Sequence, residues 1–504
     1  MKSALNLIVA TCLAIAPIVH GQENGVRSLS REDCLRMALA KNLDIRLMRF
    51  NPEFARINLW GDIAAWDPNL FMDASQSFRT SEGLRNVGEF NPSPNERWNE
   101  NFQTGLSGAT PWGMGYNLSL NQGRSSGTEF FVRSNQVFSA DAPFFYTPAA
   151  TISVSQPLLK DAWIDSARLQ IQLDRQELKQ TESDVRGQLI QTVSDVQSAY
   201  FDLISKRELV RVQEKALETA ERFLTEQKKR VEIGMLAPLD EKRAESQVAQ
   251  VRTALLQAQA NYTLSQNSLK ALIGDDFAGW GNGAIEPSES LSVIPTAFNR
   301  IESWNKALSI RPDIVRAKLD LERQKIQLKF RKNQLFPDLD LRGSYGIGGF
   351  DENFGPGLKD LQERRNPNHA VGVRLSFPLS NRRERAAMKS TKLRNDQLLL
   401  SLKRLEQIAI RGVDDAIVSA QAALARIDST KAERIYAEAA LDAEQRKLEN
   451  GKSTSFFVLE LQRDLTRARS DEIQAQSDYN RALVRLSELE GTSLETTGIQ
   501  LQFR

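Results

Sequence analysis

Hydrophobic positions follow two different periods along this chain, and the longer period covers most of it. From residue 158 to 233, and again from 379 to 450, apolar residues recur at three and four positions among many charged ones. Each stretch contains one glycine, no proline and many strong helix formers. This spacing predicts two very long amphipathic helices, each of about 100 Å if unbroken at 1.5 Å per residue. A shorter helix is predicted to return from each, over residues 239–273 and 456–490.

The shorter period is a strict alternation of apolar and polar residues, and it occurs in four segments: residues 70–78, 152–155, 339–347 and 371–377. Such alternation predicts β-strands with one apolar and one polar face. It is typical of transmembrane strands and equally of half-buried strands in soluble sheets. Four strands are too few for a barrel, since the smallest known barrels need about eight. A barrel would therefore need strands from several copies of the chain.

Residues 102–110 and 115–121, joined by residues 111–114, form a further candidate hairpin in the first β-segment. Whether this hairpin joins the same sheet is left open by the sequence. The residues after it are predicted as a loop, either an external loop or an aromatic girdle. Its phenylalanines are Phe130, Phe131, Phe138, Phe144 and Phe145.

The two halves of the chain repeat one another, which predicts the same order of elements in each half. Shifted by 269 positions, residues 38–75 overlay residues 307–344 without a gap. A shift of 221 aligns the ends of the β-segments, and a shift of 217 aligns the return helices. Identical pairs include Ala38 and Ala307, Pro68 and Pro337, Ser75 and Ser344, Ser155 and Ser376, Pro157 and Pro378, Gly234 and Gly451, and Tyr262 and Tyr479.

Together these patterns predict a chain built from two structural repeats. A signal peptide is expected at 1–21, an equatorial linker at 275–300 and a C-terminal tail at 492–504. The first repeat, at 22–274, is expected to contain a helix, a β-segment at about 69–157 and a helical hairpin at about 160–273. The second repeat, at 301–491, is expected to contain a helix, a β-hairpin at about 338–378 and a helical hairpin at about 383–490.

The N-terminus is expected to be a secretory signal. Lys2 provides the positive start, residues 4–19 carry no charge, and Gly21 is a small residue at the expected cleavage point. Sixteen apolar residues are short for a membrane anchor, which needs about 20. No later segment approaches that length, so an exported chain of this kind would cross a membrane only as a closed β-barrel.

Composition excludes several classes of function. The 66 Lys and Arg balance 64 Asp and Glu, for a formal net charge of +2, so no basic excess is present to bind nucleic acid. The chain of 504 residues has two Cys and two His, and removal of the signal would leave only Cys34 and His369. That is too few for an intramolecular disulfide or a Cys/His metal site. We therefore expect no catalytic residues, no bound metal and no cofactor.

Several motifs, in their order along the chain, resemble those of the TolC-like outer-membrane efflux protein family. Residues 33–45 resemble the family's opening helix. The segments 155–158 (Ser-Gln-Pro-Leu) and 376–379 (Ser-Phe-Pro-Leu) resemble its exit from strand to helix. Residues 231–245 resemble the tip of its helical hairpin. The resemblance covers nearly all of the mature chain.

This resemblance implies a mainly α fold with a β-barrel. The family's homotrimer places twelve strands, four from each chain, as a barrel among outer-membrane lipid, and the barrel would be larger if the extra hairpin contributed. Its helices form a tunnel across the periplasm, with a girdle that would here include residues 274–300 and 492–504. Such a channel exports substrates passively for an inner-membrane pump, through a periplasmic adaptor protein.

The resemblance also implies where the adaptor docks and where the channel closes. The docking tips would be Gly234, Met235 and Leu236 in the first repeat, and Gly451, Lys452 and Ser453 in the second. Taken by residue type alone, each glycine is explained as a helix-ending residue.

The family's gate is a ring of acidic side chains just beyond the tips, which Asp240 and Glu460 would supply here. Such a ring would repel anions and favour cations. Phe457 stands at a position that is often acidic in the family, so a hydrophobic ring that excludes water is the alternative gate. Ser453 replaces a basic partner found in some members, and Lys452 is a candidate substitute. Asp240 is equally explained as a first-turn acid that the helix N-terminus favours.

Two other kinds of protein fit parts of the sequence. A periplasmic coiled-coil scaffold without transport activity would have the same long helices. An enzyme lacks support, because no nucleophile motif, phosphate-binding loop or metal spacing is found. The exported substrate is not readable from the sequence.

Overall fold

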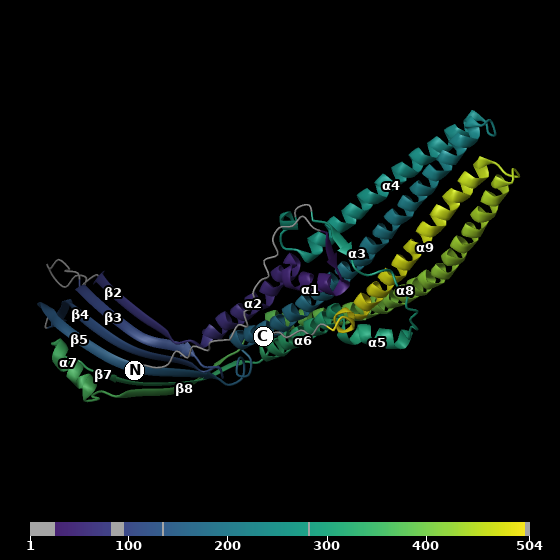
Figure 1. Ribbon diagram of the computed structural model, residues 1–504. Coiled ribbons are helices and arrows are strands. Elements are labelled where there is room, and N and C mark those ends of the chain that lie inside the picture. The colour runs from purple at the N-terminus through teal and green to yellow at the C-terminus, as the bar shows by residue number, and fades with distance from the viewer. Residues whose placement is uncertain (1–25, 82–94, 134–135, 281–282, 499–504) are drawn as a thin grey trace. The chain divides into compact units, whose positions relative to one another are not determined.

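The computed structural model describes residues 26–81, 95–133, 136–280 and 283–498, so the expected signal peptide lies outside the described residues (Figure 1). The chain forms two compact units. Of the described residues, 26–46, 189–303 and 412–498 belong to a helical unit, and those within 47–188 and 304–411 to a sheet unit. Each unit takes corresponding parts of both halves of the chain.

Two helical hairpins dominate the helical unit. Helix α3 (Ser166–Glu232) has 67 residues and α8 (Arg382–Glu449) has 68, and both contribute their C-terminal parts to this unit. Their return arms are α4 (Pro238–Ile273) and α9 (Ser455–Glu490), of 36 residues each. Each return helix begins one residue before the position expected from the sequence.

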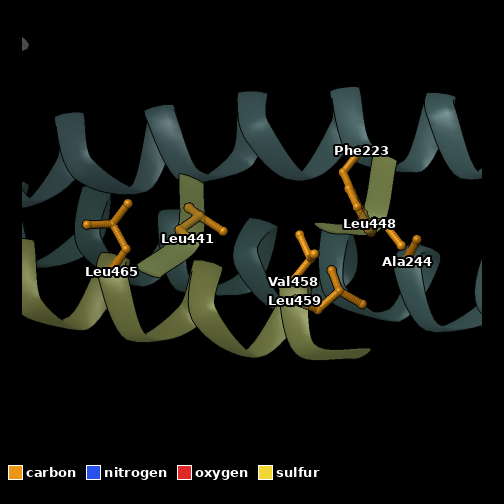
Figure 2. Packing of buried hydrophobic residues seen from close by; sticks show 7 residues of the cluster. All are labelled: Phe223, Ala244, Leu441, Leu448, Val458, Leu459 and Leu465. Carbon is orange, nitrogen blue, oxygen red and sulfur yellow. The ribbon is translucent and has the colours of Figure 1, made fainter. Parts of the chain in front are cut away.

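A small apolar core holds the two hairpins together near their tips. Figure 2 shows side chains from all four helices meeting there. Val458 of α9 is fully buried and Ala244 of α4 is 1% exposed. The other members are Phe223, Leu441, Leu448, Leu459 and Leu465. Burial of large apolar side chains contributes about 1.5–3 kcal/mol each, so this cluster fixes how the hairpins pack.

Hydrogen bonds fasten the linker after α4 to the helices of the same unit. The hydroxyl of Tyr262 in α4 donates to the carbonyl oxygen of Ile285 (3.1 Å), and that of Tyr479 in α9 donates to Ile294 (2.9 Å). The two tyrosines are equivalent under the repeat shift of 217. Strand β6 (Ile285–Pro287) also pairs in parallel with β1 (Arg27–Leu29).

Short helices complete the region before each β-segment. The single helix expected before the β-segment of each repeat is interrupted in both repeats. The first forms α1 (Arg31–Lys41), α2 (Leu43–Ile63) and the 3₁₀ turn η1 (Ala64–Trp66), and the second forms α5 (Arg300–Ile310) and α6 (Pro312–Asn333). Asn42 breaks the first because its side chain accepts hydrogen bonds from the backbone of Asp44 and Ile45, which starts a new helix. Pro312 starts the other, as proline favours a first helical position.

The sheet unit contains a six-stranded antiparallel sheet. Its strands are β2 (Asn69–Ser81), β3 (Asn95–Ala109), β4 (Gly115–Arg133), β5 (Gln136–Pro157), β7 (Asp338–Gly348) and β8 (Asn368–Ser376), in the order β2-β3-β4-β5-β7-β8 (Figure 1). The extra hairpin, whose place the sequence left open, joins the same sheet as β3 and β4, so one chain supplies six strands and not four.

The phenylalanine-rich segment is also strand and not loop, as it lies within β4 and β5. The register between β4 and β5 shifts between Ser125 and Gly127, opposite Ala142 and Phe145. Because a bulge moves side chains to the opposite face, the period of two is interrupted within the stretch that the sequence suggested as a loop. A short helix, α7 (Phe354–Gln362), lies between β7 and β8 and was not expected.

Register keeps one face of this sheet apolar and the other polar. Leu70, Leu106, Leu118, Ile152 and Tyr345 are successive partners across five strands, and each is at least 40% exposed. The row on the opposite face is polar: Asn69, Ser107, Asn117, Ser153 and Ser344. Among the described helices, none combines the length and the apolar character that a membrane-spanning helix needs.

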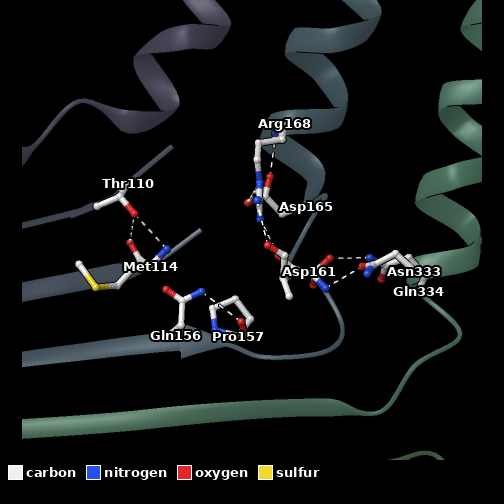
Figure 3. A network of polar contacts seen from close by, with 10 residues as sticks. Thr110, Met114, Gln156, Pro157, Asp161, Asp165, Arg168, Asn333 and Gln334 are labelled. Carbon is white, nitrogen blue, oxygen red and sulfur yellow. Dashed lines mark hydrogen bonds and ion pairs between the residues drawn. The ribbon is translucent and has the colours of Figure 1, made fainter. Parts of the chain in front are cut away.

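A polar network fixes the turn from β5 into α3 (Figure 3). Asp161 has a φ of 61°, in the left-handed region, and its backbone N–H donates to Oδ1 of Asn333 in α6 (2.7 Å). Arg168 donates to the carbonyl oxygen of Asp161 (2.5 Å) and to the carboxylate of Asp165 (3.1 Å). The strand-to-helix exit is thus held against both α3 and α6.

Candidate functional site at the helical tips

The two tips are built in the same way. In the first, the N–H of Gly234 donates to Val231 O (2.9 Å) and that of Met235 to Arg230 O (2.8 Å). In the second, Gly451 donates to Leu448 O (3.1 Å) and Lys452 to Lys447 O (2.8 Å). This pair of bonds is the Schellman motif, which satisfies the last carbonyls of a helix.

Glycine is required at both turns. The φ angles are 76° at Gly234 and 69° at Gly451, where a side chain would be strained. No heavy atom lies within 4 Å of a Cβ built on either residue, so conformation and not space selects glycine. The role of helix-ending residue is therefore sufficient to explain both.

The other tip residues differ between the repeats. Met235 is 70% exposed and Leu236 half-buried, so the first tip offers an apolar surface to solvent. In the second, Lys452 is exposed, while the hydroxyl of Ser453 donates to Glu444 of α8. That bond, with help from Lys447, lowers the pKa of Glu444 below its usual range. Ser453 thus stabilises a charged acid within its own hairpin.

The expected gate residues lie on the first turns of the two return helices. Asp240 is half-buried, and its carboxylate lies 3.8 Å from the guanidinium of Arg243. Phe457 is 50% exposed and makes an edge contact with Phe456, with ring centroids 5.5 Å apart. Glu460 is exposed, one turn further along α9. Under the repeat shift of 217, Asp240 and Phe457 are equivalent positions, so one chain presents an acid and an aromatic ring at the same level of its two hairpins.

Asp240 lies on α4, whereas Phe457 and Glu460 lie on α9. A rigid support lies behind them. The hydroxyl of Ser455 donates to Oε1 of Gln227 in α3 (2.9 Å), and both side chains are at most 1% exposed. Val458 and Ala244 pack in the apolar cluster next to this bond. The first turns of α4 and α9 are therefore firmly positioned.

Ion pairs between the arms of each hairpin were missed by the sequence reasoning. The two partners of each pair lie at similar distances along the sequence on either side of the tip. Aligning the two predicted arms antiparallel about the tip glycine would therefore have identified these pairs. In the first hairpin Arg252 pairs with Glu221 and Lys228 with Glu245, and in the second Arg434 pairs with Glu472, Arg469 with Glu438 and Arg426 with Asp478.

In the part of the chain that is described, no three His, Cys, Asp or Glu side chains gather as metal ligands would. The single described cysteine, Cys34, is fully buried, and burial raises the pKa of its thiol to about 12. A thiol with such a pKa is not a nucleophile at neutral pH.

Relatives of known name match parts of the chain. The pyoverdine export outer membrane protein OpmQ of Pseudomonas aeruginosa is 26% identical over 308 residues, which span 59% of this chain and 60% of that protein. The cobalt-zinc-cadmium resistance protein CzcC of Cupriavidus metallidurans is 23% identical over 62% of this chain and 68% of that protein. The chain thus spans about 60% of the length of the first of these relatives.

Solved structures match nearly the whole fold. The outer membrane protein VceC of Vibrio cholerae superposes with a TM-score of 0.63 at 18% identity, covering 92% of this chain and 96% of that one. The CmeC outer membrane channel of Campylobacter jejuni gives a TM-score of 0.63 at 15% identity, covering 97% and 94%. These likenesses confirm the expected fold class of long helices joined to β-segments.

The model of the family described as outer membrane efflux protein matches residues 117–275 and 304–492, which is more than half of the chain. This match confirms the family resemblance seen in the sequence. The chain belongs to the outer membrane efflux protein family.

Proposed function

We propose that this protein is the exit duct of an efflux or secretion system, a passive channel that carries substrates from an inner-membrane pump across the outer membrane. The observation that carries the proposal is the sheet. Its register gives one exposed apolar face and one polar face over six strands, as a barrel wall between lipid and water requires. The long helices α3 and α8, which follow β5 and β8, would then form the periplasmic wall.

The working form is a homotrimer, because one chain supplies too few strands to enclose a water-filled channel. A periplasmic adaptor is proposed to dock at the two tips, on the residues around Gly234 and Gly451. The apolar side chain of Met235 supports this, since it is 70% exposed at the end of its hairpin. The relatives are named for different cargoes, pyoverdine and metal ions, so the pump would decide what is exported.

Three copies of Asp240 and Glu460 around the axis would form the proposed acidic gate, with Phe457 as a hydrophobic alternative. Conductance of purified protein in planar bilayers tests both ideas. Replacing Asp240 and Glu460 by Ala should raise conductance and weaken block by divalent cations. Phe457→Ala should raise conductance without changing the block. Asp442→Ala, an exposed acid elsewhere in the second hairpin, serves as the matched control.

A scaffold without transport activity is the competing function. A detergent-soluble trimer that never conducts, under any condition, would favour it. A protein that washes from membranes with salt alone would do the same. Unchanged currents in the acid variants would remove Asp240 and Glu460 from the gate and leave the channel itself in place.

A further inference from the structure

Helix α8 begins with a row of positive charges that nothing in the described chain neutralises. The row consists of Arg382, Arg385, Lys389 and Lys392, all of them exposed. Their spacing of three and four residues places them on one face of the helix, over a length of about 15 Å. None of the four makes an ion pair or a side-chain hydrogen bond within the described residues. We call this row the cationic stripe.

The cationic stripe costs helix stability. Like charges three and four residues apart on a helix repel one another. Arg382 is also the first residue of α8, where the helix dipole disfavours a cation. Packing within one chain therefore does not account for the four charges, and an anionic partner outside the chain would offset their repulsion.

The first repeat shows that the fold does not require these cations. By the shift of 221, the equivalent positions are Asp161, Ile164, Arg168 and Ile171. Both isoleucines are only 2% exposed, and Arg168 pairs with Asp165 (3.1 Å). An exposed, unpaired row of charge is thus particular to the second repeat.

The contacts of α8 show which way the cationic stripe faces. Three of its residues, or residues just before it, make polar contacts with α6 and the turn after α6. These contacts are Asn381 to Leu335 (3.2 Å), Glu384 to Arg331 (3.9 Å) and Thr391 to Gln324 (3.1 Å). Stripe residues 382, 385 and 392 each follow one of these contact residues directly. They therefore lie about 100° further round the helix than the contact with α6.

The hand of the strands then identifies the side of the sheet to which the stripe belongs. Gly349 donates to Pro148 O (2.8 Å) and Leu158 to Leu339 O (2.8 Å), and residues 148 and 158 share the apolar face with Ile152. For L-residues, this places β7 to the left of β5 when the apolar face is viewed with β5 running downwards. Strand β8 lies further left, so α6 is to the right of α8. Descending a right-handed helix, a rotation of about 100° from the right points towards the viewer, so the stripe faces the apolar side.

We propose that the cationic stripe binds the phosphate groups of anionic phospholipids in the membrane leaflet that faces the periplasm. The inference rests on the proposed channel function, which places the apolar face of the sheet against lipid, and it adds a lipid class as a partner. Exposed apolar side chains continue from β8 to the start of the stripe, namely Leu375 (66%), Phe377 (46%) and Leu379 (96%).

Apolar and cationic surface thus adjoin on this side of the chain as acyl chains and phosphate adjoin in a lipid. A phospholipid along β8 would rest its acyl chains on the apolar residues and its phosphate beside Arg382 and Arg385. Guanidinium and ammonium groups form charge-assisted hydrogen bonds with phosphate oxygens. This continuity favours a lipid over a free anion as the occupant.

Native mass spectrometry of the purified protein in nonionic detergent tests the proposal. The probes are dioleoylphosphatidylglycerol, which is anionic, and dioleoylphosphatidylcholine, which has no net charge. The unmodified protein should bind the anionic lipid at least about tenfold more tightly, since several cations act on one phosphate. The combined variant Arg382→Gln, Arg385→Gln, Lys389→Gln and Lys392→Gln should lose this preference and keep its binding of phosphatidylcholine. Equal affinity of the unmodified protein for both lipids overturns the proposal.

The matched control removes four other exposed cations further along the same helix. It combines Lys403→Gln, Arg404→Gln, Arg411→Gln and Lys431→Gln, and so has the same net charge as the stripe variant. The control should retain the preference for the anionic lipid. An equal loss in both variants would mean that net charge alone attracts the lipid, and the stripe would not be a site.

Two further measurements separate the remaining explanations. Inorganic phosphate, added at constant ionic strength, should not displace phosphatidylglycerol, and displacement would reassign the stripe to free phosphate. Sedimentation should show the same assembly in both variants, whereas loss of assembly in the stripe variant with its lipid preference intact would reassign the stripe to a contact between copies. Bilayer conductance tests the underlying function. Conductance without lipid preference rejects this inference alone, and absence of conductance in the unmodified protein rejects the channel.

Discussion

At the scale of single residues, Asp174 in α3 is the side chain with the most unusual environment. It is 8% exposed, accepts a hydrogen bond from Gln170 (2.9 Å), and leaves its other oxygen without a partner. Burial, and then the neighbouring carboxyl of Asp62 in α2, raise the pKa of Asp174 to about 6. Asp174 therefore binds a proton more tightly in the folded protein than an ordinary aspartate does.

Asp174→Asn should make the protein more stable at neutral pH. An acid whose pKa is raised in the folded state destabilises folding as pH rises from about 4 towards 6, because the folded state binds the proton more tightly. The asparagine variant does not lose stability in this way. Its free energy of unfolding should therefore exceed that of the unmodified protein by about 1 kcal/mol at pH 7.5 and should equal it at pH 4. Thermal unfolding in detergent at both pH values measures this. Asp195→Asn, an exposed acid on the same helix, should not change the pH dependence, and an equal gain there would contradict the prediction.

At the scale of elements, the second helical hairpin is held by a charged network between its arms. The guanidinium of Arg434 in α8 lies between Glu472 of α9 and Glu438 (3.1 Å), and Arg469 of α9 donates to Glu438 (2.8 Å). Arg469, and then Arg434, lower the pKa of Glu438. Its contribution is present at neutral pH and is lost as pH falls through that lowered value.

Arg434→Ala should lower the free energy of opening this hairpin by about 1 kcal/mol. The substitution leaves the carboxylate of Glu472, which is only 14% exposed, without its partner. Hydrogen exchange of α8 and α9 should become faster at neutral pH, and the difference from the unmodified protein should shrink in acid. Arg446→Ala is the control, since its pair with Asp442 lies within α8 and is well exposed. Exchange that is equally fast in both variants would show that the network does not hold the arms.

At the scale of the whole molecule, assembly is expected to depend on apolar surface that one chain leaves open. Helix α2 exposes an apolar stripe of Leu47, Phe50, Phe54, Ile57 and Trp60. This apolar stripe is larger than scattered surface residues explain, and contiguous exposed apolar surface marks an interaction site. Phe54 lies in its middle, where the repeat equivalent Arg323 makes an ion pair inside the chain.

Phe54→Asn should weaken the proposed trimer, because each contact between copies would lose about 2 kcal/mol of apolar burial. Sedimentation in detergent should then show more monomer at low protein concentration. Arg49→Asn, on the same helix and exposed, should leave the trimer unchanged. A Phe54 variant that assembles as tightly as the original protein would mean that α2 lies outside the subunit contact.

Much of this protein was predictable because its patterns are local and repeated. The long helices follow from uninterrupted helix formers at apolar spacing, and the tips from Gly234 and Gly451, whose left-handed turns are nearly specific to glycine. The extra hairpin was found in the sequence as a candidate, but the extension of its strands through the phenylalanine-rich segment was not, because the register shift between Ser125 and Gly127 disturbs the alternation there. The roles of Asp240, Phe457 and Glu460 stay predictions, as a ring of side chains exists only between copies.

The sequence by itself determined the family, the two-fold repeat, the helical hairpins and the alternating faces of four strands, since each depends on residue type and spacing along one segment. Only the tertiary structure decided that the sheet has six strands, that its register keeps one apolar face, and that ion pairs join the arms of each hairpin. These features depend on which segments, distant in sequence, pack against one another. The hydrophobic period of a strand or a helix identifies the element and its apolar face, but it does not identify the segment that packs on that face.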